Sequence, residues 1–203
     1  MRTRRKQGKP RVVIISGPNG AGKSTSAPGA LKGGLRVTEF VNADVIARGL
    51  SAFEPERVAL TAGRIMLERL RELASARESF AFETTLASRS FAPWIADLIG
   101  SGYEFHLTYF WLPSPEMAIA RVSGRVQSGG HNVPPDTVRR RYYGGIRNFF
   151  ELYQPIADTW WVYDNADPAG ARLISSGGRV KRQRIYRAKD WKQILAARDR
   201  SEA

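Results

Sequence analysis

Apolar residues gather along this chain in short runs that polar and glycine-containing segments separate. The run RVVIIS at 11–16 is almost continuously apolar, which is typical of a strand buried on both faces of a sheet. β-Branched and aromatic residues predict four further strands, at 36–42, 79–85, 103–112 and 159–165. The segment 171–186 predicts a hairpin that turns at Ser176-Gly177-Gly178.

Helical spacing of the apolar residues dominates between these strands. In the range 55–77, a proline stands near the start and apolar residues return every three or four positions. Further helices are predicted directly after the glycine-rich loop at 16–22, within 90–102, at 114–127, from Asp136 onward and at 188–198. The first of these contains Pro28 and Gly29, and we expect Pro28 to disturb it because an interior proline removes a backbone donor.

Strands that alternate with helices predict an α/β fold, in which helices cover both faces of a parallel sheet. We expect a basic N-terminal arm at 1–10 and a single domain over 11–203. Within that domain, residues 121–147 form a lid region, and residues 171–203 form a basic hairpin and a closing helix.

The net charge of +13 is carried mainly by the two ends of the chain. Residues 1–11 hold six basic and no acidic groups, and residues 179–203 hold nine basic and three acidic groups. The segment between them is nearly balanced, with 17 basic and 16 acidic groups. Such charge runs are usually solvated tails, but they could also dock on an acidic partner or on nucleic acid.

The composition also bears on the compartment. The chain has no Cys, which excludes disulfides and thiolate metal sites and suits a reducing environment. No apolar run approaches the roughly 20 residues that cross a bilayer. The apolar run after the basic N-terminus leads into a glycine loop and not into a signal-peptide cleavage site. We therefore expect a cytoplasmic protein with no membrane partner.

The segment SGPNGAGKST at 16–25 fits the phosphate-binding pattern G-x-x-x-x-G-K-[ST], directly after the first predicted strand. Its glycines let successive backbone N–H groups face phosphates, and the following helix presents its positive end. Lys23 is placed to reach the β- and γ-phosphates of ATP, and the Ser24 hydroxyl to bind Mg²⁺. The predicted ATP-binding residues are Gly17, Pro18, Asn19, Gly20, Ala21, Gly22, Lys23, Ser24 and Thr25.

ATPases and kinases share this loop, so the loop alone does not distinguish them. The residues at the ends of the other strands are more informative. Ligands of open α/β sheets sit beyond the carboxyl ends of the strands, where Asp44, Glu83 and Asp164 are expected. A kinase needs a carboxylate to accept the proton of the acceptor hydroxyl. Each residue has a second interpretation: Asp44 could cap the next helix, Glu83 could serve the metal, and Asp164 could belong to a turn.

Arginines cluster between the fourth and fifth predicted strands. Arg121 and Arg125 share a helix face at a spacing of four residues. A second basic segment follows a Gly-Gly/Pro-Pro break, and the further lid candidates are His131, Arg139, Arg140, Arg141 and Arg147. A lid of this kind could place guanidinium groups on transferring phosphates. Three successive residues cannot share one helix face, so part of the 139–141 triplet faces solvent.

Taken together and in order, GPNGAGKST, FVNAD, FETTLAS, RVSGRVQSGGHNVP and VYDN resemble the zeta-toxin family of P-loop kinases. The resemblance spans residues 11–165. It implies an adenylate-kinase-like core and ATP–Mg²⁺-dependent phosphorylation of a small molecule. The best-known substrate of the family is UDP-N-acetylglucosamine, which is phosphorylated on the 3′-hydroxyl of the sugar with loss of cell-wall synthesis. A separate antitoxin protein is the partner that the resemblance implies.

Carried over by resemblance, Lys23 matches the phosphate-loop lysine and Asp44 the general base. Asn42, Glu83 and Thr84 fall in the strand-end motifs near the substrate, and Arg125, or otherwise Arg121, matches the first lid arginine. This chain departs from the family at the second lid arginine, which falls close to His131. His131 itself or one of the arginines at 139–141 would replace it. The chain is also shorter than the plasmid-borne toxins.

Two other functions remain compatible with the motifs. A polynucleotide or tRNA kinase would use the same lysine, aspartate and arginines, with the basic ends holding nucleic acid. A nucleotide-switched ATPase or binding module would have no acceptor, so replacing Asp44 by Asn would leave its nucleotide turnover unchanged.

Overall fold

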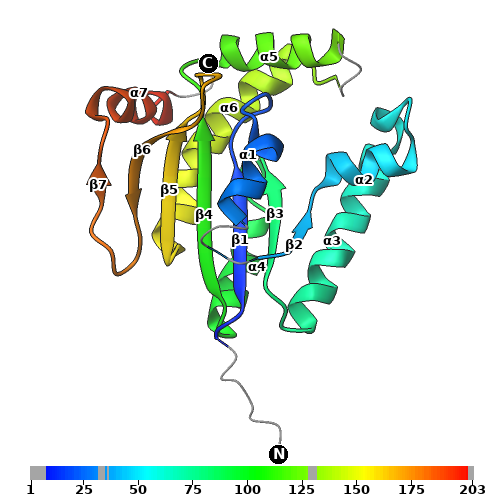
Figure 1. Ribbon diagram of the computed structural model, residues 1–203, viewed down its shortest axis with the longest axis vertical. Helices are drawn as coiled ribbons and strands as arrows, with labels where there is room; N and C mark the ends of the chain where they lie inside the picture. The colour runs from blue at the N-terminus through cyan, green and yellow to red at the C-terminus, as the bar shows by residue number, and fades with distance from the viewer. Residues whose placement is uncertain (1–7, 32–34, 36, 128–131, 201–203) are drawn as a thin grey trace, which may run out of the picture.

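The computed structural model describes residues 8–31, 35, 37–127 and 132–200. In this part of the chain, seven strands form one sheet in the order β2-β3-β1-β4-β5-β6-β7 (Figure 1). Five are parallel: β1 (Arg11–Ser16), β2 (Glu39–Val41), β3 (Phe80–Thr84), β4 (Glu104–Trp111) and β5 (Thr159–Asp164). The hairpin strands β6 (Arg172–Gly177) and β7 (Arg184–Ile185) each run antiparallel to the strand before them.

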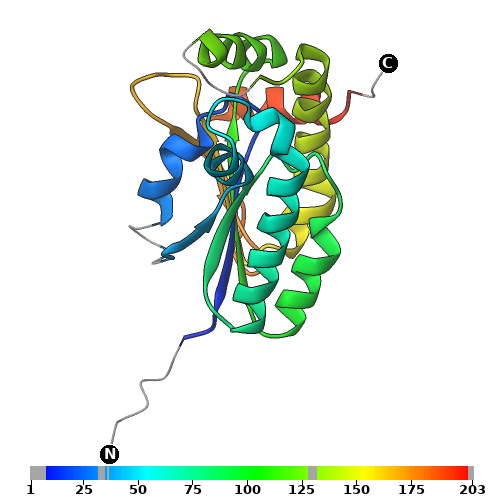
Figure 2. The same ribbon diagram turned by 90° about the vertical axis from the view of Figure 1, so that its right-hand side faces the viewer.

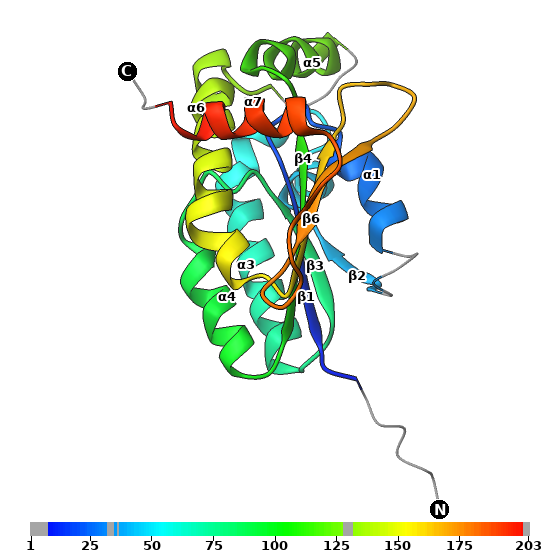
Figure 3. The same ribbon diagram turned by 90° about the vertical axis from the view of Figure 1, so that its left-hand side faces the viewer.

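Helices cover both faces of this sheet. Figures 2 and 3 show α3 (Ala59–Ser75), α4 (Phe91–Gly100) and α6 (Pro135–Asn148) on one face and α1 (Lys23–Ala30) on the other. Helix α5 (Pro115–Gln127) lies across the end at which β4 finishes. The remaining helices are α2 (Ala43–Leu50), the 3₁₀ turn η2 (Pro55–Val58), the π segment η3 (Phe149–Tyr153), the 3₁₀ turn η4 (Gln154–Ile156) and α7 (Ala188–Arg198). The α/β fold predicted from the sequence is confirmed.

The hydrophobic core follows the central strand. Val12, Val13, Ile14 and Ile15 have no exposed surface, as their unbroken apolar run predicts. Aromatic side chains pack between the sheet and the helices on the face that α6 covers. There Tyr109 of β4 packs against Phe149 with ring centroids 5.3 Å apart. This burial fixes the end of β1, and with it the loop that follows.

Two helices differ in detail from those that the sequence predicts. The range predicted as one helix at 55–77 begins as the 3₁₀ turn η2 before α3 starts. Helix α1 runs through Pro28 and Gly29 to Ala30, so Pro28 does not end it, although the next residue, Leu31, has π-helical geometry.

The hairpin turn lies later than predicted. Gly177 is the last residue of β6 and pairs with Trp160, so the chain reverses between 178 and 183. A Cβ at Gly177 would lie 2.6 Å from the Trp160 ring. Gly177 is therefore not a turn residue; its lack of a side chain allows the Trp160 ring to pack closely against it.

Candidate active site

The phosphate loop connects β1 to α1 in a backbone shape that requires glycine. Gly17 has φ +138°, and a Cβ there would collide with the carbonyl oxygen of Phe110. Gly22 has φ +73°, and a Cβ there would lie 2.7 Å from Nδ2 of Asn165. Positive φ values and close packing together explain the glycine pattern of the motif. Helix α1 begins at Lys23, so its positive end faces the loop.

Lys23 is buried beneath this loop, with 6% of its surface exposed. Its Nζ donates a hydrogen bond to the carbonyl oxygen of Pro18 at 2.9 Å and lies 3.5 Å from Oε1 of Glu83. Burial lowers the pKa of the Lys23 ammonium below its ordinary value, although Glu83 and Asp44 both favour the charged form. The lysine is thus aimed at the inside of the loop, as the motif predicts.

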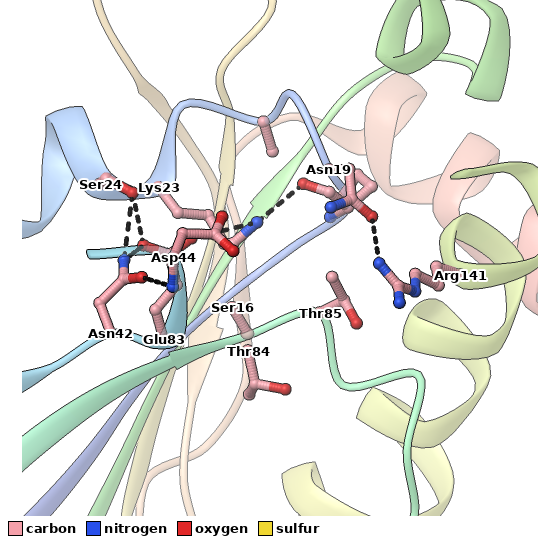
Figure 4. A network of polar contacts seen from close by, with 12 residues as sticks. Ser16, Asn19, Lys23, Ser24, Asn42, Asp44, Glu83, Thr84, Thr85 and Arg141 are labelled. Carbon is pink, nitrogen blue, oxygen red and sulfur yellow. Dashed lines mark hydrogen bonds and ion pairs between the residues drawn. The ribbon is translucent and has the colours of Figure 1, made fainter. Parts of the chain in front are cut away.

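Glu83 at the end of β3 joins three elements. Its Oε2 accepts hydrogen bonds from Ser24 Oγ at 2.7 Å and from Asn42 Nδ2 at 2.8 Å (Figure 4). Together with the Lys23 ion pair, these contacts engage both carboxylate oxygens. The position favours the interpretation in which Glu83 serves the metal side of the site beside Ser24.

Asn42 and Asp44 lie at the start of helix α2 and have different roles there. Asn42 is the N-cap: its Oδ1 accepts hydrogen bonds from the backbone N–H groups of Asp44 at 2.8 Å and Val45 at 3.3 Å. The alternative that Asp44 caps this helix is therefore wrong. Asp44 stands exposed in the first turn, and its carboxylate lines the same cavity as Lys23 and Glu83.

Two arginines complete the wall of this cavity from the other side. Arg125 of α5 and Arg141 of α6 both line it. Arg141 is partly buried, and its Nη1 donates to Oδ1 of Asn19 in the phosphate loop at 3.4 Å (Figure 4). Burial is the main cause that lowers the pKa of Arg141 below its ordinary value, while Asp44 opposes the shift. Opposite charges thus face each other across the cavity.

The other lid candidates among the described residues do not line this cavity. Arg121 donates from Nη1 to the carbonyl oxygen of Asn165 at 2.8 Å and from Nη2 to that of Ala166 at 2.6 Å. Arg139 pairs with Glu116 of α5, and Arg140 is exposed. His131 lies outside the described residues.

The loop after β5 contacts the phosphate loop through Asn165, a residue to which the sequence assigned no role. Asp164 accepts a hydrogen bond from the backbone N–H of Ala166 at 2.9 Å, so it forms part of a turn, the second of its two interpretations. The next residue, Asn165, donates from Nδ2 to the carbonyl oxygen of Ala21 at 2.7 Å. The sequence offered one indication of this contact, which is that an amide side chain directly follows a buried strand.

The loop after β3 is hydrogen-bonded to the last residue of α6, the helix that carries Arg141. Nδ2 of Asn148 donates to the carbonyl oxygens of Leu86 at 2.7 Å and Ala87 at 3.2 Å. Thr84 and Thr85 line the cavity, and their hydroxyls accept hydrogen bonds from the backbone two residues on. No sequence motif marked Asn148, because its partners are backbone atoms that only the fold brings near.

The resulting cavity has a volume of about 120 Å³. It is lined by the end of β3, the start of α2, the last turn of α5, the middle of α6 and the phosphate loop. No group of three or more His, Cys, Asp or Glu side chains that could hold a metal occurs among the described residues. Mg²⁺ does not require such a cage, because it usually binds one or two carboxylates together with substrate phosphates. The Ser24 hydroxyl and the Glu83 carboxylate, 2.7 Å apart, are oxygen ligands of that type.

The sheet order, the glycine loop after β1 and the cations above it define a P-loop kinase-like fold. The chain belongs to the AAA domain family, whose model matches residues 12–143. An uncharacterised protein of Haemophilus influenzae is 28% identical over 138 residues, which cover 65% of this chain and 92% of that protein.

Solved structures share the fold at low sequence identity. A crystal structure of AvrRxo1-ORF1:-ORF2 with ATP matches with a TM-score of 0.73 and 15% identity over 96% of this chain. This chain spans 66% of the matched AvrRxo1 chain, just under two thirds of its length. The PezAT chromosomal toxin–antitoxin system of Streptococcus pneumoniae matches with a TM-score of 0.62 and 15% identity, over 97% of this chain and 87% of that one. None of the helices in the described ranges is long and apolar enough to cross a membrane.

Proposed function

We propose that this protein is an ATP-dependent kinase that transfers the γ-phosphate to a hydroxyl group of a small molecule. One observation carries the proposal: the Asp44 carboxylate lines the same cavity as Lys23, Arg125 and Arg141. Within the described residues, no hydrogen bond or ion pair engages this carboxylate, unlike that of Glu83. A carboxylate in this position suits a general base for an acceptor hydroxyl, which an ATPase does not need.

The residues divide the proposed reaction among them. The acceptor oxygen bonds to the γ-phosphorus while the bond to the β–γ bridging oxygen breaks, and ADP leaves. The hydroxyl proton passes to Asp44. Lys23 holds the β- and γ-phosphates, and Arg125 and Arg141 offset the negative charge on the oxygens of the phosphoryl group in transfer.

Ser24 and Glu83 are the residues that would hold Mg²⁺. The metal supplies charge neutralisation of the phosphates when bound. Asn42 keeps the Glu83 carboxylate in place through its amide, and it orients α2 so that Asp44 points to the cavity.

The leading acceptor is the 3′-hydroxyl of the sugar in UDP-N-acetylglucosamine. Two lines support it: the ordered motifs that resemble the zeta-toxin family, and the shared fold with the PezAT system. The cavity of about 120 Å³ is smaller than the about 300–1,000 Å³ of sites that enclose a whole ligand. It would admit only the reacting part of the acceptor, while the uridine diphosphate would extend outside it. A separate antitoxin chain is the corresponding proposed partner.

Product analysis tests the proposal. The purified protein is incubated with Mg²⁺–ATP and a mixture of nucleotide sugars, nucleosides and small RNAs, and the products are examined by mass spectrometry. A nucleotide sugar that gains one phosphate supports the proposal and identifies the acceptor. Phosphate on RNA alone would replace the small-molecule kinase by a polynucleotide kinase.

A further inference from the structure

A second pocket lies on the face of the sheet opposite to helix α6. Successive side chains of β5 alternate between the two faces. Trp160 packs on Trp191 of α7 and on Phe149, whereas Trp161 points to the other face and stacks on His106 of β4. Figure 1 shows β4, β5 and β6 on this face without a helix drawn in front of their lower parts.

This pocket, here called the hairpin pocket, has a volume of about 430 Å³. The residues that matter for its chemistry are Trp161, Lys181, Arg182, Arg184 and Tyr186. It lies near the start of β5 and the end of β6, whereas the phosphate loop follows the end of β1. Because β1, β4 and β5 run parallel, the two sites occupy opposite ends of the sheet.

The cations of the hairpin pocket lack partners that their neighbours have. Arg179 pairs with Asp158, and Arg187 pairs with Asp190. Among the described residues, no carboxylate lies within ion-pair distance of Lys181, Arg182 or Arg184, and all three are exposed. Three unpaired cations beside two aromatic rings form a surface for an anion that also carries a flat ring.

We propose that the hairpin pocket binds single-stranded nucleic acid, with bases stacked on Trp161 and Tyr186 and phosphates held by Lys181, Arg182 and Arg184. A cationic groove that carries aromatic platforms is how proteins bind single strands with little sequence preference. A duplex keeps its bases stacked on each other, so it would leave the two rings unused. This site goes beyond the proposed kinase reaction and does not depend on it.

Binding is measured by fluorescence anisotropy with a labelled oligothymidylate of about ten nucleotides, within the roughly 4–16 nucleotides that an OB fold covers on a single strand. The full chain is used without ATP. With three phosphate contacts, the logarithm of affinity should fall with the logarithm of salt at a slope of about −2. Lys23→Ala should bind equally well, because the phosphate loop takes no part.

Two charge-matched double variants locate the site. Arg182→Glu/Arg184→Glu should weaken binding at least about tenfold and reduce the salt slope to about −0.7. Lys189→Glu/Lys192→Glu changes the net charge equally on exposed positions of α7 and should leave affinity within about threefold. Equal losses in both would show diffuse attraction and overturn the proposal.

Two variants of Tyr186 test whether stacking on its ring contributes to binding. Tyr186 is 54% exposed, so its replacement does not open the core. Tyr186→Ala should lose about tenfold in affinity, whereas Tyr186→Phe should bind as the unaltered chain does, because a phenyl ring stacks equally well. The proposal is wrong if no oligonucleotide binds, or if thymidine monophosphate competes as strongly per mole as the oligonucleotide. It is also wrong if vesicles of anionic lipid bind through these residues while the oligonucleotide does not.

Discussion

The Glu83 carboxylate accepts a hydrogen bond from the Ser24 hydroxyl at 2.7 Å, and this contact links the end of strand β3 to the first turn of helix α1. The same oxygen accepts from Asn42, while the other lies 3.5 Å from Lys23. Both oxygens of this carboxylate are thereby engaged by residues of the phosphate loop, helix α1 and Asn42. The second carboxylate of the cavity, Asp44, has no such contacts among the described residues, and we propose that it serves the acceptor.

This division predicts different losses for two carboxamide variants. Asp44→Asn should keep the increase in melting temperature that Mg²⁺–ATP gives, but lose phosphoryl transfer by about 10²-fold or more, because the acceptor proton has no base. Glu83→Gln should lose the Mg²⁺–ATP stabilisation itself. Thermal shift and initial transfer rates measure both. Transfer by Asp44→Asn at the unaltered rate would remove Asp44 from the mechanism.

The arginines of α6 give a matched pair. Arg141 lines the cavity and contacts Asn19, whereas Arg140 beside it is exposed. Arg141→Ala should lower kcat by about 10²-fold or more, because the negative charge on the transferring phosphoryl group is then no longer offset by this guanidinium. Arg140→Ala should change it by no more than about twofold, as expected of a surface substitution. Equal effects of the two would contradict the assignment of Arg141.

Asn42 should stabilise helix α2 independently of its contact with Glu83. Asn42→Ser and Asn42→Ala both remove the amide that binds Glu83, but only serine can still cap the helix. The alanine variant should therefore be less stable than the serine variant by about 1 kcal/mol. Urea unfolding gives the difference directly, and identical midpoints would exclude the capping role.

Alanine substitutions at Gly17 in the loop and at Gly29 in helix α1 should have opposite effects on stability. Gly17→Ala forces a Cβ toward the carbonyl oxygen of Phe110 at φ +138°, so stability and nucleotide affinity should both fall. Gly29 lies inside α1 with open space around it, and Gly29→Ala should stabilise the protein by about 0.5–1 kcal/mol. Urea unfolding and ATP titration of the two variants check this, and a loss of stability for both would show that α1 has no room at Gly29.

Stability should depend on the protonation of His106. Burial lowers the pKa of His106 below 6.5, an effect that Arg11 and Lys181 reinforce and that Glu104 and Asp158 oppose. The unfolded chain therefore takes up this proton at higher pH than the folded one, so stability should fall as pH drops below about 6.5. The urea midpoint of His106→Gln should fall less than that of the unaltered chain between about pH 7 and pH 5.5. Parallel curves would show that His106 does not contribute.

The sequence predicted the strands, most helices and the nucleotide loop, because each depends on local periodicity or on a contiguous motif. The α5–α6 pair was predicted as well, but not which arginine faces the cavity. That choice depends on how α6 packs against the loop after β3, where Asn148 donates to the carbonyl oxygens of Leu86 and Ala87.

Two other site features needed the fold. Arg121 and Arg125 share a spacing that cannot separate them, yet the loop after β5 offers Arg121 two carbonyl oxygens. Asn165 reaches Ala21 over a separation of 144 residues, which no local pattern encodes. Long-range backbone contacts thus decide which members of a predicted set line the cavity.

The stoichiometry of the reaction tests the central claim most directly. With Mg²⁺–ATP and UDP-N-acetylglucosamine, ADP and phosphorylated sugar nucleotide are quantified together over time. The proposed kinase predicts one phosphorylated acceptor for each ADP, with ADP formation slowing when the acceptor is left out. ADP that forms at the same rate with and without any acceptor, while no acceptor gains phosphate, would contradict the account and leave an ATPase.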